Sequence, residues 1–433
     1  MPNNADAMVR RSGSSSMVDP LLEGGQTVKK RSPTRLSGMD EAPVSPEPAA
    51  QDRSQYMGVK LTALAILLSV AAMWSLCGRG GTILGGGTLS SAVPMPAFDS
   101  SRALSCPDAG ERESPYTLVA NHEGRDFLHG WGFWSAADPQ QGLVNYRNKE
   151  DAARLNYTFY DEGADAFILQ PDSTSRLGEW ENRDSVRIET TSLYKYGLVV
   201  LDAEHMPAGC GLWPAFWMYD FPWPVAGEID IIEGVHNSTE NRVALHTTSK
   251  CAMKWEPSTF TGTMDKNLYG APGANCDVKA EDQKPNVGCG IKDFTYGEGF
   301  NQGGGGVYAM EWTSDGISVW FFPRRHIPRD LHCKNPQPTK WGQPMARFEF
   351  GAHCDKSSFD FQHIVINLTF CGVWGERDFA AWGCQHQGLT CQEFVRQKPE
   401  ALKEAYWKIR NVRVYQTPEG LVDPNGKVGP HDM

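Results

Sequence analysis

Positive charge is in short supply in this sequence, and so are the cysteine spacings that bind metals. The 433 residues include 41 Lys or Arg against 52 Asp or Glu, which gives a formal net charge of −11. Nucleic acid repels a chain with this acidic balance, so we expect no nucleic-acid partner. The eleven cysteines form no CxxC pair, which disfavours a zinc ribbon, and we expect no metal and no other cofactor.

Helical periodicity is equally thin, and no internal repeat is present. Thr390 and Glu393 fit a capping box at the start of a helix, and Pro399 limits its length. The glycine run at 303–306 has no Lys-Ser or Lys-Thr after it, so it predicts a loop at a cleft edge rather than a phosphate cradle.

Aromatic residues are plentiful, with 14 Trp, 13 Tyr and 19 Phe, and hydrophobic residues make up 40% of the chain. Flat aromatic faces can stack on sugar rings, although core packing accounts for most aromatic residues in most proteins. Ten of the eleven cysteines lie between Cys106 and Cys391, and Cys77 stands apart. An even number of scattered cysteines favours several disulfides and an oxidising compartment, but their connectivity cannot be deduced from the sequence.

The N-terminal part of the chain predicts a membrane anchor. Residues 1–56 are rich in Ser, Pro, Gly and charge, which is typical of disorder. Residues 57–77 form an apolar run with one charge, Lys60, and such a length spans a bilayer. The run lies too far from the N-terminus for an ordinary cleaved signal peptide. Residues 78–112, with glycines, serines and prolines, predict a flexible stalk.

The cysteines and three glycosylation sequons set the expected orientation of this anchor. The sequons begin at Asn156, Asn237 and Asn367, all downstream of the apolar run. Together these features predict a single-pass type II membrane protein. Its N-terminus would lie in the cytosol and its large domain outside the cell or in the lumen of the secretory pathway.

Residues 113–416 have the texture of an all-β sandwich, and residues 417–433 form a polar tail. Short apolar or alternating runs recur between Gly, Pro and Asn turns. The strands expected from these runs are 185–191, 197–206, 211–218, 227–233, 242–248, 306–312, 316–322, 363–370 and 407–415.

Three acids stand close together in GEIDIIEGVH, residues 227–236. Glu228 and Asp230 share one face of a strand, because side chains alternate with period two. Strict alternation would bury Glu233, but a one-residue β-bulge near Ile231 and Ile232 returns it to the same face. The sequence therefore predicts a row of three carboxylates on one side of a bulged strand.

Such a row suits glycosidic bond cleavage with retention of configuration, which needs two carboxyl groups about 5–5.5 Å apart. Two long glutamates can lean toward one bond, and the shorter aspartate between them can share a proton with a neighbour. Three carboxyls in one row cannot all ionise freely, so their pKa values should spread apart. A solvated strand face or a calcium site is the alternative, but calcium needs six to eight oxygens, and a line of acids does not encircle an ion.

The motif EIDIIE resembles the catalytic signature of glycoside hydrolase family 16 in its bulged laminarinase-type form. The resemblance extends through residues 205–251 (HMPAGCGLWPAFWMYDFPWPVAGEIDIIEGVHNSTENRVALHTTSKC) and covers roughly residues 114–416, where it is similar to fungal endo-1,3(4)-β-glucanases. It implies a β-jelly roll with a long open substrate cleft and a retaining mechanism. It also implies that Glu228 is the nucleophile, Asp230 its assisting acid and Glu233 the general acid/base.

Other candidate substrate contacts are less specific. Trp213 and Trp217 lie four residues apart on one face of the preceding strand, where sugar platforms and core packing are both open. His246, on the strand after the acids, is a candidate partner for substrate or for the acid/base, or a structural histidine. Trp134 and its neighbour Trp131 line the cleft or pack in the core. Arg187 is expected to point into the cleft, because Val186 and Ile188 would face the core.

The resemblance predicts a monomeric endo-β-glucanase that hydrolyses β-1,3 or mixed β-1,3/1,4 glucans. A tether at residues 57–77 would keep it on the producing cell, which favours wall or matrix remodelling. Three alternatives stay open. A sugar hydroxyl instead of water would make the enzyme a glucan transglycosylase; the same sandwich could serve as a non-catalytic glucan-binding or assembly protein; and the polymer could be a galactan.

Overall fold

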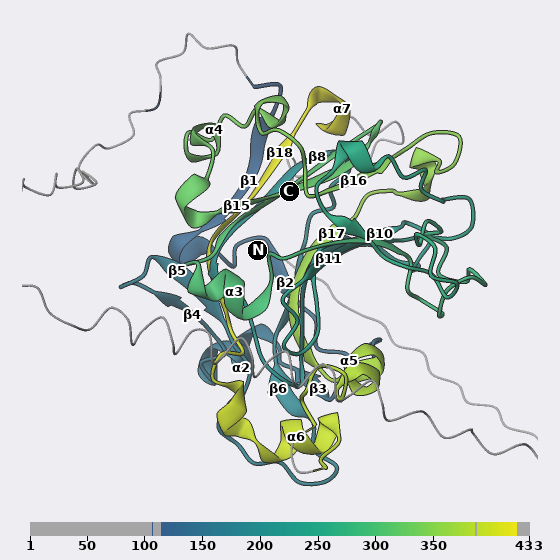
Figure 1. Ribbon diagram of the computed structural model, residues 1–433. Coiled ribbons are helices and arrows are strands. Elements are labelled where there is room, and N and C mark those ends of the chain that lie inside the picture. The colour runs from purple at the N-terminus through teal and green to yellow at the C-terminus, as the bar shows by residue number, and fades with distance from the viewer. Residues whose placement is uncertain (1–105, 107–113, 386–387, 422–433) are drawn as a thin grey trace, which may run out of the picture. The chain divides into compact units, whose positions relative to one another are not determined.

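The computed structural model describes Cys106, residues 114–385 and residues 388–421, all within one compact unit at 98–433 (Figure 1). The predicted tail at 1–56, the predicted span at 57–77 and, apart from Cys106, the predicted stalk at 78–112 lie outside these residues. Across the part of the chain that is described, no helix is long and apolar enough to cross a bilayer. The predicted span itself is therefore untested.

The described unit is built from two eight-stranded antiparallel sheets, so the prediction of an all-β sandwich is confirmed (Figure 1). The first sheet has the order β16-β15-β14-β8-β18-β5-β4, with β1 also paired to β18. The second sheet has the order β12-β13-β11-β10-β9-β17-β7-β2, and a separate parallel pair joins β3 to β6. Strands far apart in the chain thus lie side by side, which is typical of jelly-roll connections.

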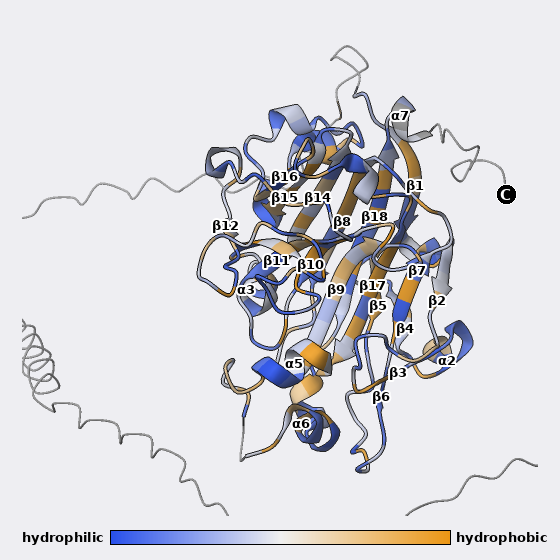
Figure 2. Cartoon of the chain, turned by 90° about the vertical axis from the view of Figure 1, so that its right-hand side faces the viewer, coloured by the Kyte–Doolittle hydropathy of each residue, from blue (hydrophilic) through white to orange (hydrophobic). Residues whose placement is uncertain are grey.

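The two sheets enclose the main core, because each strand presents alternate side chains to it. On β8 (Gly197–His205), Val199 and Leu201 face this core, while Leu198 and Val200 face a second apolar cluster on the other side of the sheet. In Figure 2 the second sheet lies in front, with α5 (Gly372–Asp378) and α6 (Cys391–Gln397) at its foot. The outer face of this sheet carries the three acids of β10.

All nine strands expected from the sequence are present, with ends that differ by at most two residues. The strands are β1 (Thr117–Glu123), β2 (Trp131–Phe133), β3 (Val144–Tyr146), β4 (Thr158–Asp161), β5 (Ala166–Leu169), β6 (Arg183–Ser185), β7 (Arg187–Thr190), β8, β9 (Leu212–Tyr219), β10 (Glu228–Glu233), β11 (Asn241–His246), β12 (Thr263–Met264), β13 (Cys289–Asp293), β14 (Gly306–Thr313), β15 (Gly316–Pro323), β16 (Ala346–Glu349), β17 (His363–Phe370) and β18 (Trp407–Gln416).

The helices of the described residues are short; all but α7, which follows the last strand, lie in the connections between strands. Beside α5 and α6 they are α2 (Lys149–Arg154), α3 (Gly297–Gln302), α4 (Arg329–His332) and α7 (Pro418–Leu421), with 3₁₀ turns at Gly124–Asp126, Pro257–Thr259, Arg324–His326, Pro338–Lys340, Lys356–Ser358 and Pro399–Leu402. The predicted capping box is confirmed at α6, where the side chains of Thr390 and Glu393 each bond the other's backbone N–H. The glycine run at 303–306 turns the chain from α3 into β14. Gly305 has a φ of +78° there, and a Cβ would collide with the carbonyl oxygen of Ala203 on β8.

Ten cysteines form five disulfides, which confirms the prediction of a disulfide-bonded domain. The pairs are Cys106–Cys333, Cys210–Cys384, Cys251–Cys354, Cys276–Cys289 and Cys371–Cys391. Three of them close loops of more than 100 residues, and cross-links of that length restrict the unfolded chain most strongly.

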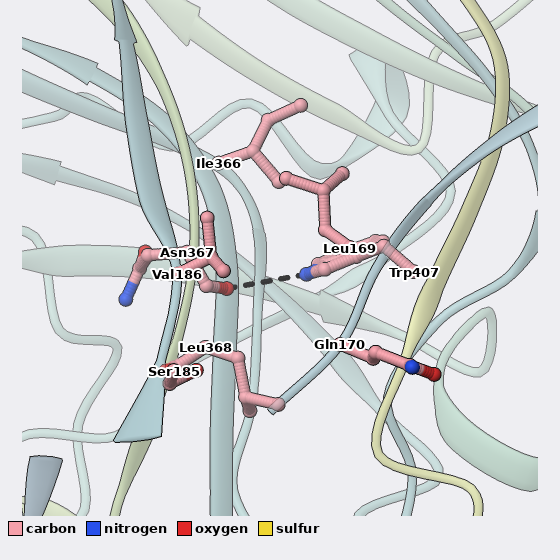
Figure 3. Close-up of a pocket in the computed structure, with 8 residues that line it drawn as sticks. All are labelled: Leu169, Gln170, Ser185, Val186, Ile366, Asn367, Leu368 and Trp407. Carbon is pink, nitrogen blue, oxygen red and sulfur yellow. Dashed lines mark hydrogen bonds between the residues drawn. The ribbon is translucent and has the colours of Figure 1, made fainter. Parts of the chain in front are cut away.

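A small gap between the two sheets, shown in Figure 3, belongs to the core and not to a functional site. Its lining includes Leu169, Val186, Ile366 and Trp407, and none of the three acids. The backbone carbonyl of Asn367 accepts a hydrogen bond from Trp407 Nε1 at 3.2 Å across this gap, while the Asn367 side chain points away from it.

The sequon at Asn367 does not fit a glycosylated residue, and we correct that prediction. Asn367 is 2% exposed; its Oδ1 accepts from Trp217 Nε1 at 2.9 Å and its Nδ2 donates to the Tyr146 hydroxyl at 3.2 Å. A glycan on Nδ2 would break this packing. Asn156 and Asn237 are exposed, although the Asn237 amide lies 3.1 Å from the Cys210 sulfur.

Glycan occupancy should follow this difference in burial. In protein made through a secretory pathway, we expect glycopeptide mass spectrometry to find a glycan at Asn156 and a bare Asn367. An Asn156→Gln variant is the matched control, since it should lose that glycan without loss of folding. A folded protein with a glycan on Asn367 would contradict the structure of β17.

Candidate active site

Strand β10 carries the three acids, and it contains the predicted bulge. Asp230 pairs with Trp217 on β9, but Ile232 pairs with the next residue, Phe216, so Ile231 is the extra residue. Ile229, Ile231 and Ile232 all lie in the main core. The bulge therefore returns Glu233 to the outer face beside Glu228 and Asp230, as the sequence predicts.

The side chain of Asn241, which was not foreseen from the sequence, holds this bulge. The ladder from β10 to β11 ends at Asp230, which leaves the next backbone groups without strand partners. Asn241 Nδ2 donates to the carbonyl of Ile231 at 2.9 Å, and its Oδ1 accepts from the N–H of Glu233 at 3.0 Å. Asn241 is completely buried, so these two bonds satisfy backbone groups that water does not reach.

His246 lies across from Glu228 in the β10–β11 ladder and reaches two of the acids. Its Nε2 is 3.0 Å from Asp230 Oδ2 and 3.7 Å from Glu228 Oε1. The imidazole is therefore at ion-pair distance from two carboxyl groups of the row. His246 was expected to contact substrate or the acid/base; in the structure it lies beside Asp230 and Glu228 instead of Glu233, and its contact with substrate stays a prediction.

Two indole N–H groups bond the two glutamates. Trp213 Nε1 donates to Glu233 Oε1 at 3.0 Å, and Trp223 Nε1 donates to Glu228 Oε2 at 2.7 Å. Trp213 is buried, whereas Trp223 is 36% exposed. The sequence pattern did not single out Trp223, although its place five residues before Glu228 in the exposed segment 221–225 was a usable signal.

Burial and mutual repulsion raise the pKa values of both glutamates. The pKa of Glu233 is raised to about 8, first by loss of solvation and then by the Asp230 carboxyl, against the opposing effect of Arg242. The pKa of Glu228 is raised well above its usual range by the same two causes, while the Trp223 hydrogen bond acts to lower it. The row therefore holds protons at a pH where exposed glutamates are ionised, and the titration belongs to the cluster as a whole.

The remaining candidates lie on the strands to one side of the row. Arg187 is buried on β7, with its guanidinium 4.6 Å from the Trp134 ring, 5.0 Å from the Trp217 ring and 5.2 Å from the Tyr219 ring. Trp134 is partly exposed and stacks near Phe221, which is 57% exposed. Arg187 thus supports an aromatic cluster from beneath rather than projecting freely from the sheet.

Trp217 and Trp131 take different places. Trp217 lies on the acid face opposite Asp230, but it is 5% exposed and its indole N–H is bonded to Asn367. Trp131 packs in the main core against Phe127, so the core alternative is the correct one for that residue.

Two groups of side chains in the described residues bring metal-ligating atoms within 4.8 Å of one another. One is Glu228, Asp230 and His246, where His246 Nε2 and Asp230 Oδ2 are 3.0 Å apart, which is ion-pair distance. The other contains Glu376 with Cys371 and Cys391, whose sulfurs are joined in a disulfide and offer no thiolate.

A two-sheet β sandwich with two glutamates and an aspartate on one bulged strand is the architecture of a sugar-cleaving hydrolase. The chain belongs to glycoside hydrolase family 16: residues 131–415 match the model described as XgeA-like, catalytic GH16 domain.

Individual relatives agree with this membership. The chain is 39% identical over 310 residues to the endo-1,3(4)-beta-glucanase of Arthroderma benhamiae, in an alignment that covers 70% of this chain and 65% of that relative. It is similar to a solved structure of laminarinase 16A from Phanerochaete chrysosporium, with 40% identity, a TM-score of 0.63, and coverage of 70% of this chain and 99% of that one. It is also similar to an elongating family 16 β-1,3-glucosyltransferase, with 36% identity, a TM-score of 0.64, and coverage of 70% and 100%.

The raised pKa of Glu233 predicts a specific pH dependence of stability. Its pKa is about 8 in the folded protein against 4.5 for an unperturbed glutamate. A raised folded pKa contributes stability that is fully present below about pH 4.5 and is lost as the pH rises through about 8. In thermal unfolding, Glu233→Gln should therefore be more stable than wild type by several degrees at about pH 9.

The exposed Glu179 provides the matched control, since Glu179→Gln should leave the pH profile of unfolding unchanged. A Glu233→Gln variant that follows the wild-type profile up to pH 9 would show that Glu233 titrates as an ordinary glutamate.

Proposed function

We propose that this protein is a retaining endo-β-glucanase that acts on β-1,3 or mixed β-1,3/1,4 glucans. The observation that carries the proposal is the pair Glu228 and Glu233, each bonded by its own indole N–H, with Asp230 and His246 between and beside them. The printed names of the relatives, an endo-1,3(4)-β-glucanase and a laminarinase, support the choice of polymer.

In the first step, the Glu228 carboxylate attacks the anomeric carbon while Glu233 gives its proton to the departing glycosidic oxygen. The C–O bond to the leaving sugar breaks, and an ester bond joins the donor sugar to Glu228. The raised pKa of Glu233 suits this role, because the group still holds its proton near neutral pH. Glu228 must lose its proton before it attacks, against its own raised pKa. The Trp223 hydrogen bond to its Oε2 and the positive charges of Arg187 and Arg242 favour the charged form.

In the second step, the Glu233 carboxylate takes a proton from water, and the water oxygen replaces the Glu228 ester oxygen at the anomeric carbon. Two inversions give net retention. His246 Nε2 and Asp230 Oδ2 lie 3.0 Å apart beside Glu228, so both side chains are placed to respond to its change of charge.

The aromatic side chains around the row supply sugar contacts in this proposal. Trp223 exposes its ring beside the nucleophile. The exposed ring of Phe221 stacks near Trp134, which lies over Arg187. Such faces stack on the apolar faces of sugars and would line an open cleft across the outer face of the second sheet. Trp213 and Trp217 act from below, by holding Glu233 and the sheet face in place.

Glucan transfer is the second candidate function, and one comparison favours it. One similar solved structure is described as an elongating β-1,3-glucosyltransferase. In this protein, transfer would keep the first step proposed above and use a sugar hydroxyl in place of water in the second. A non-catalytic glucan-binding role is less favoured, because all three acids are present and brought together. A galactan substrate has no specific support from the relatives.

The products formed from laminarin, lichenan and a defined oligosaccharide test the proposal. Full-length protein should shorten laminarin and lichenan, and NMR should show the β-anomer of each new end first. Glu228→Gln should reduce turnover by about a thousandfold or more, because it removes the carboxylate that forms the ester, while oligosaccharide binding is largely kept.

The pattern of products distinguishes hydrolysis from the alternatives. Products longer than the donor would establish transfer, and binding without any change in the sugar would establish the scaffold role. Initial α-anomers, or full turnover by Glu228→Gln, would overturn the retaining mechanism with Glu228 as nucleophile.

We further propose that residues 57–77 anchor a monomeric protein in a membrane, with the catalytic domain outside the cell or in the secretory lumen. The apolar length of that run and the five disulfides of the catalytic unit support this topology. An enzyme held in this way acts at the surface of the cell that makes it, which fits cell-wall remodelling.

Protease protection in sealed vesicles tests this topology. Protease added from the cytosolic side should digest residues 1–56 and leave residues 114–416 intact until detergent is added. Digestion of the catalytic unit with protection of residues 1–56 would show the opposite orientation. Release of the whole chain by alkaline carbonate would contradict a membrane anchor at residues 57–77.

A further inference from the structure

A buried arginine stands beside the acid/base on the side away from the aromatic cluster. Arg242 follows Asn241 on β11 and shares the outer face of the sheet with Ala244 and His246, while Val243 and Leu245 face the core. Its Nη1 is 3.8 Å from Glu233 Oε2. Neither the motif nor its spacing had drawn attention to this residue.

Arg242 is shared between two carboxylates. Its Nε donates to Asp265 Oδ2 at 2.6 Å, and its Nη2 donates to the carbonyl of Val287 at 2.8 Å. The other oxygen of Asp265 is 3.2 Å from Lys292 Nζ on β13. The contacts therefore run as a line of alternating charge: Glu233, Arg242, Asp265 and Lys292.

A glycine in the neighbouring strand leaves room for the contact between Arg242 and Asp265. Gly290 on β13 pairs with Ala244, so two small residues lie next to each other on the outer face of the sheet. A Cβ on Gly290 would lie 2.6 Å from Asp265 Oδ2 and 2.9 Å from both Nε and Nη2 of Arg242. A side chain at this position would push the arginine and the aspartate apart. The close ion pair thus depends on a missing side chain in the neighbouring strand.

The other polar groups around Glu233 come from three elements. Asp230 on its own strand adds negative charge, His246 on β11 adds a group that can be positive, and Trp213 on β9 donates a neutral hydrogen bond. The buried phenol of Tyr296, just before α3, packs its ring against Gly234. Among these neighbours Arg242 brings the one permanent positive charge, because a guanidinium does not lose its proton in this pH range.

We propose that Arg242 is a positioning residue that orients Glu233 and sets how readily it changes charge, and that Asp265 limits this effect by holding the guanidinium on its other side. The inference deepens the proposed function, since it gives the acid/base a tuning group. Arg242 does not touch the scissile bond in this arrangement; it acts through Glu233.

Two substitutions should move the charge balance in opposite directions. Arg242→Gln removes a cation that favours ionised Glu233, so the pKa of Glu233 should rise by about one unit or more. Asp265→Asn removes an anion that both repels ionised Glu233 and occupies Arg242, so the same pKa should fall. A residue with a purely structural role would lower stability without such opposite shifts.

The measurement is an NMR titration of isotope-labelled glutamate carboxyls in the full chain, with the Glu233 signal assigned by its absence in Glu233→Gln. The alkaline limb of kcat/KM on a laminari-oligosaccharide should move in the same direction as the titration. Arg183→Gln is the matched control, because Arg183 is another fully buried arginine with an aspartate partner, Asp172, at 3.2 Å. It should cost stability and leave the titration of Glu233 in place.

Opposite shifts in the two variants, with no shift in the control, would establish the proposal. An unshifted Glu233 in folded Arg242→Gln would overturn it. Should Arg242→Gln fail to fold, Asp265→Asn decides alone, and an unchanged or raised pKa there would also overturn it. Wild-type protein without action on glucans would defeat the proposed function, but the titration would still report on Arg242.

Discussion

The two hydrogen bonds from Asn241 to the bulge of β10 are the constraint on which the site depends. An extra residue in a central strand leaves backbone groups unpaired, and in a buried place each such group is costly. Asn241 supplies both a donor and an acceptor at that point, to Ile231 and Glu233. The same side chain therefore makes the bulge stable and turns Glu233 onto the face of Glu228. Without the bulge, Glu233 would point into a core of isoleucines.

Once three carboxyls share a buried face, their charge becomes the next constraint. Loss of solvation raises the pKa of Glu228 and of Glu233. Hydrogen bonds from Trp223 and Trp213 lower the two pKa values again in part, and so does the positive charge of Arg242 and His246. These groups come from strands on both sides of β10 and from the segment before it. The sandwich serves the chemistry by bringing them to one place and by keeping water from most of them. That exclusion of water strengthens each interaction.

The sequence predicted the nine strands, the disulfide-bonded domain, the bulge and the row of acids, because these rest on local alternation and on an unbroken motif. It named His246 as a candidate partner of substrate or of the acid/base, and the structure sets this residue beside Asp230 and Glu228. Arg187, which was expected to point into the cleft, lies buried beneath the Trp134 ring. It was wrong about Asn367, since a sequon carries no information on burial and this asparagine bonds Trp217 and Tyr146 inside the sheet. It left the role of Trp131 open, and the core packing around Phe127 decided that question.

What the sequence determined by itself is local: which residues alternate, where a strand must bulge, and which short motif marks the family. What only the tertiary structure decided is the set of partners that act across strands. The roles of Asn241, Arg242 and Asp265 have no local signal in the sequence, because each of these side chains bonds a group that is brought next to it only by strand pairing and folding. Strand register and the missing side chain of Gly290 create those contacts. Register is set by the whole sheet, and so no stretch of the chain could reveal it alone.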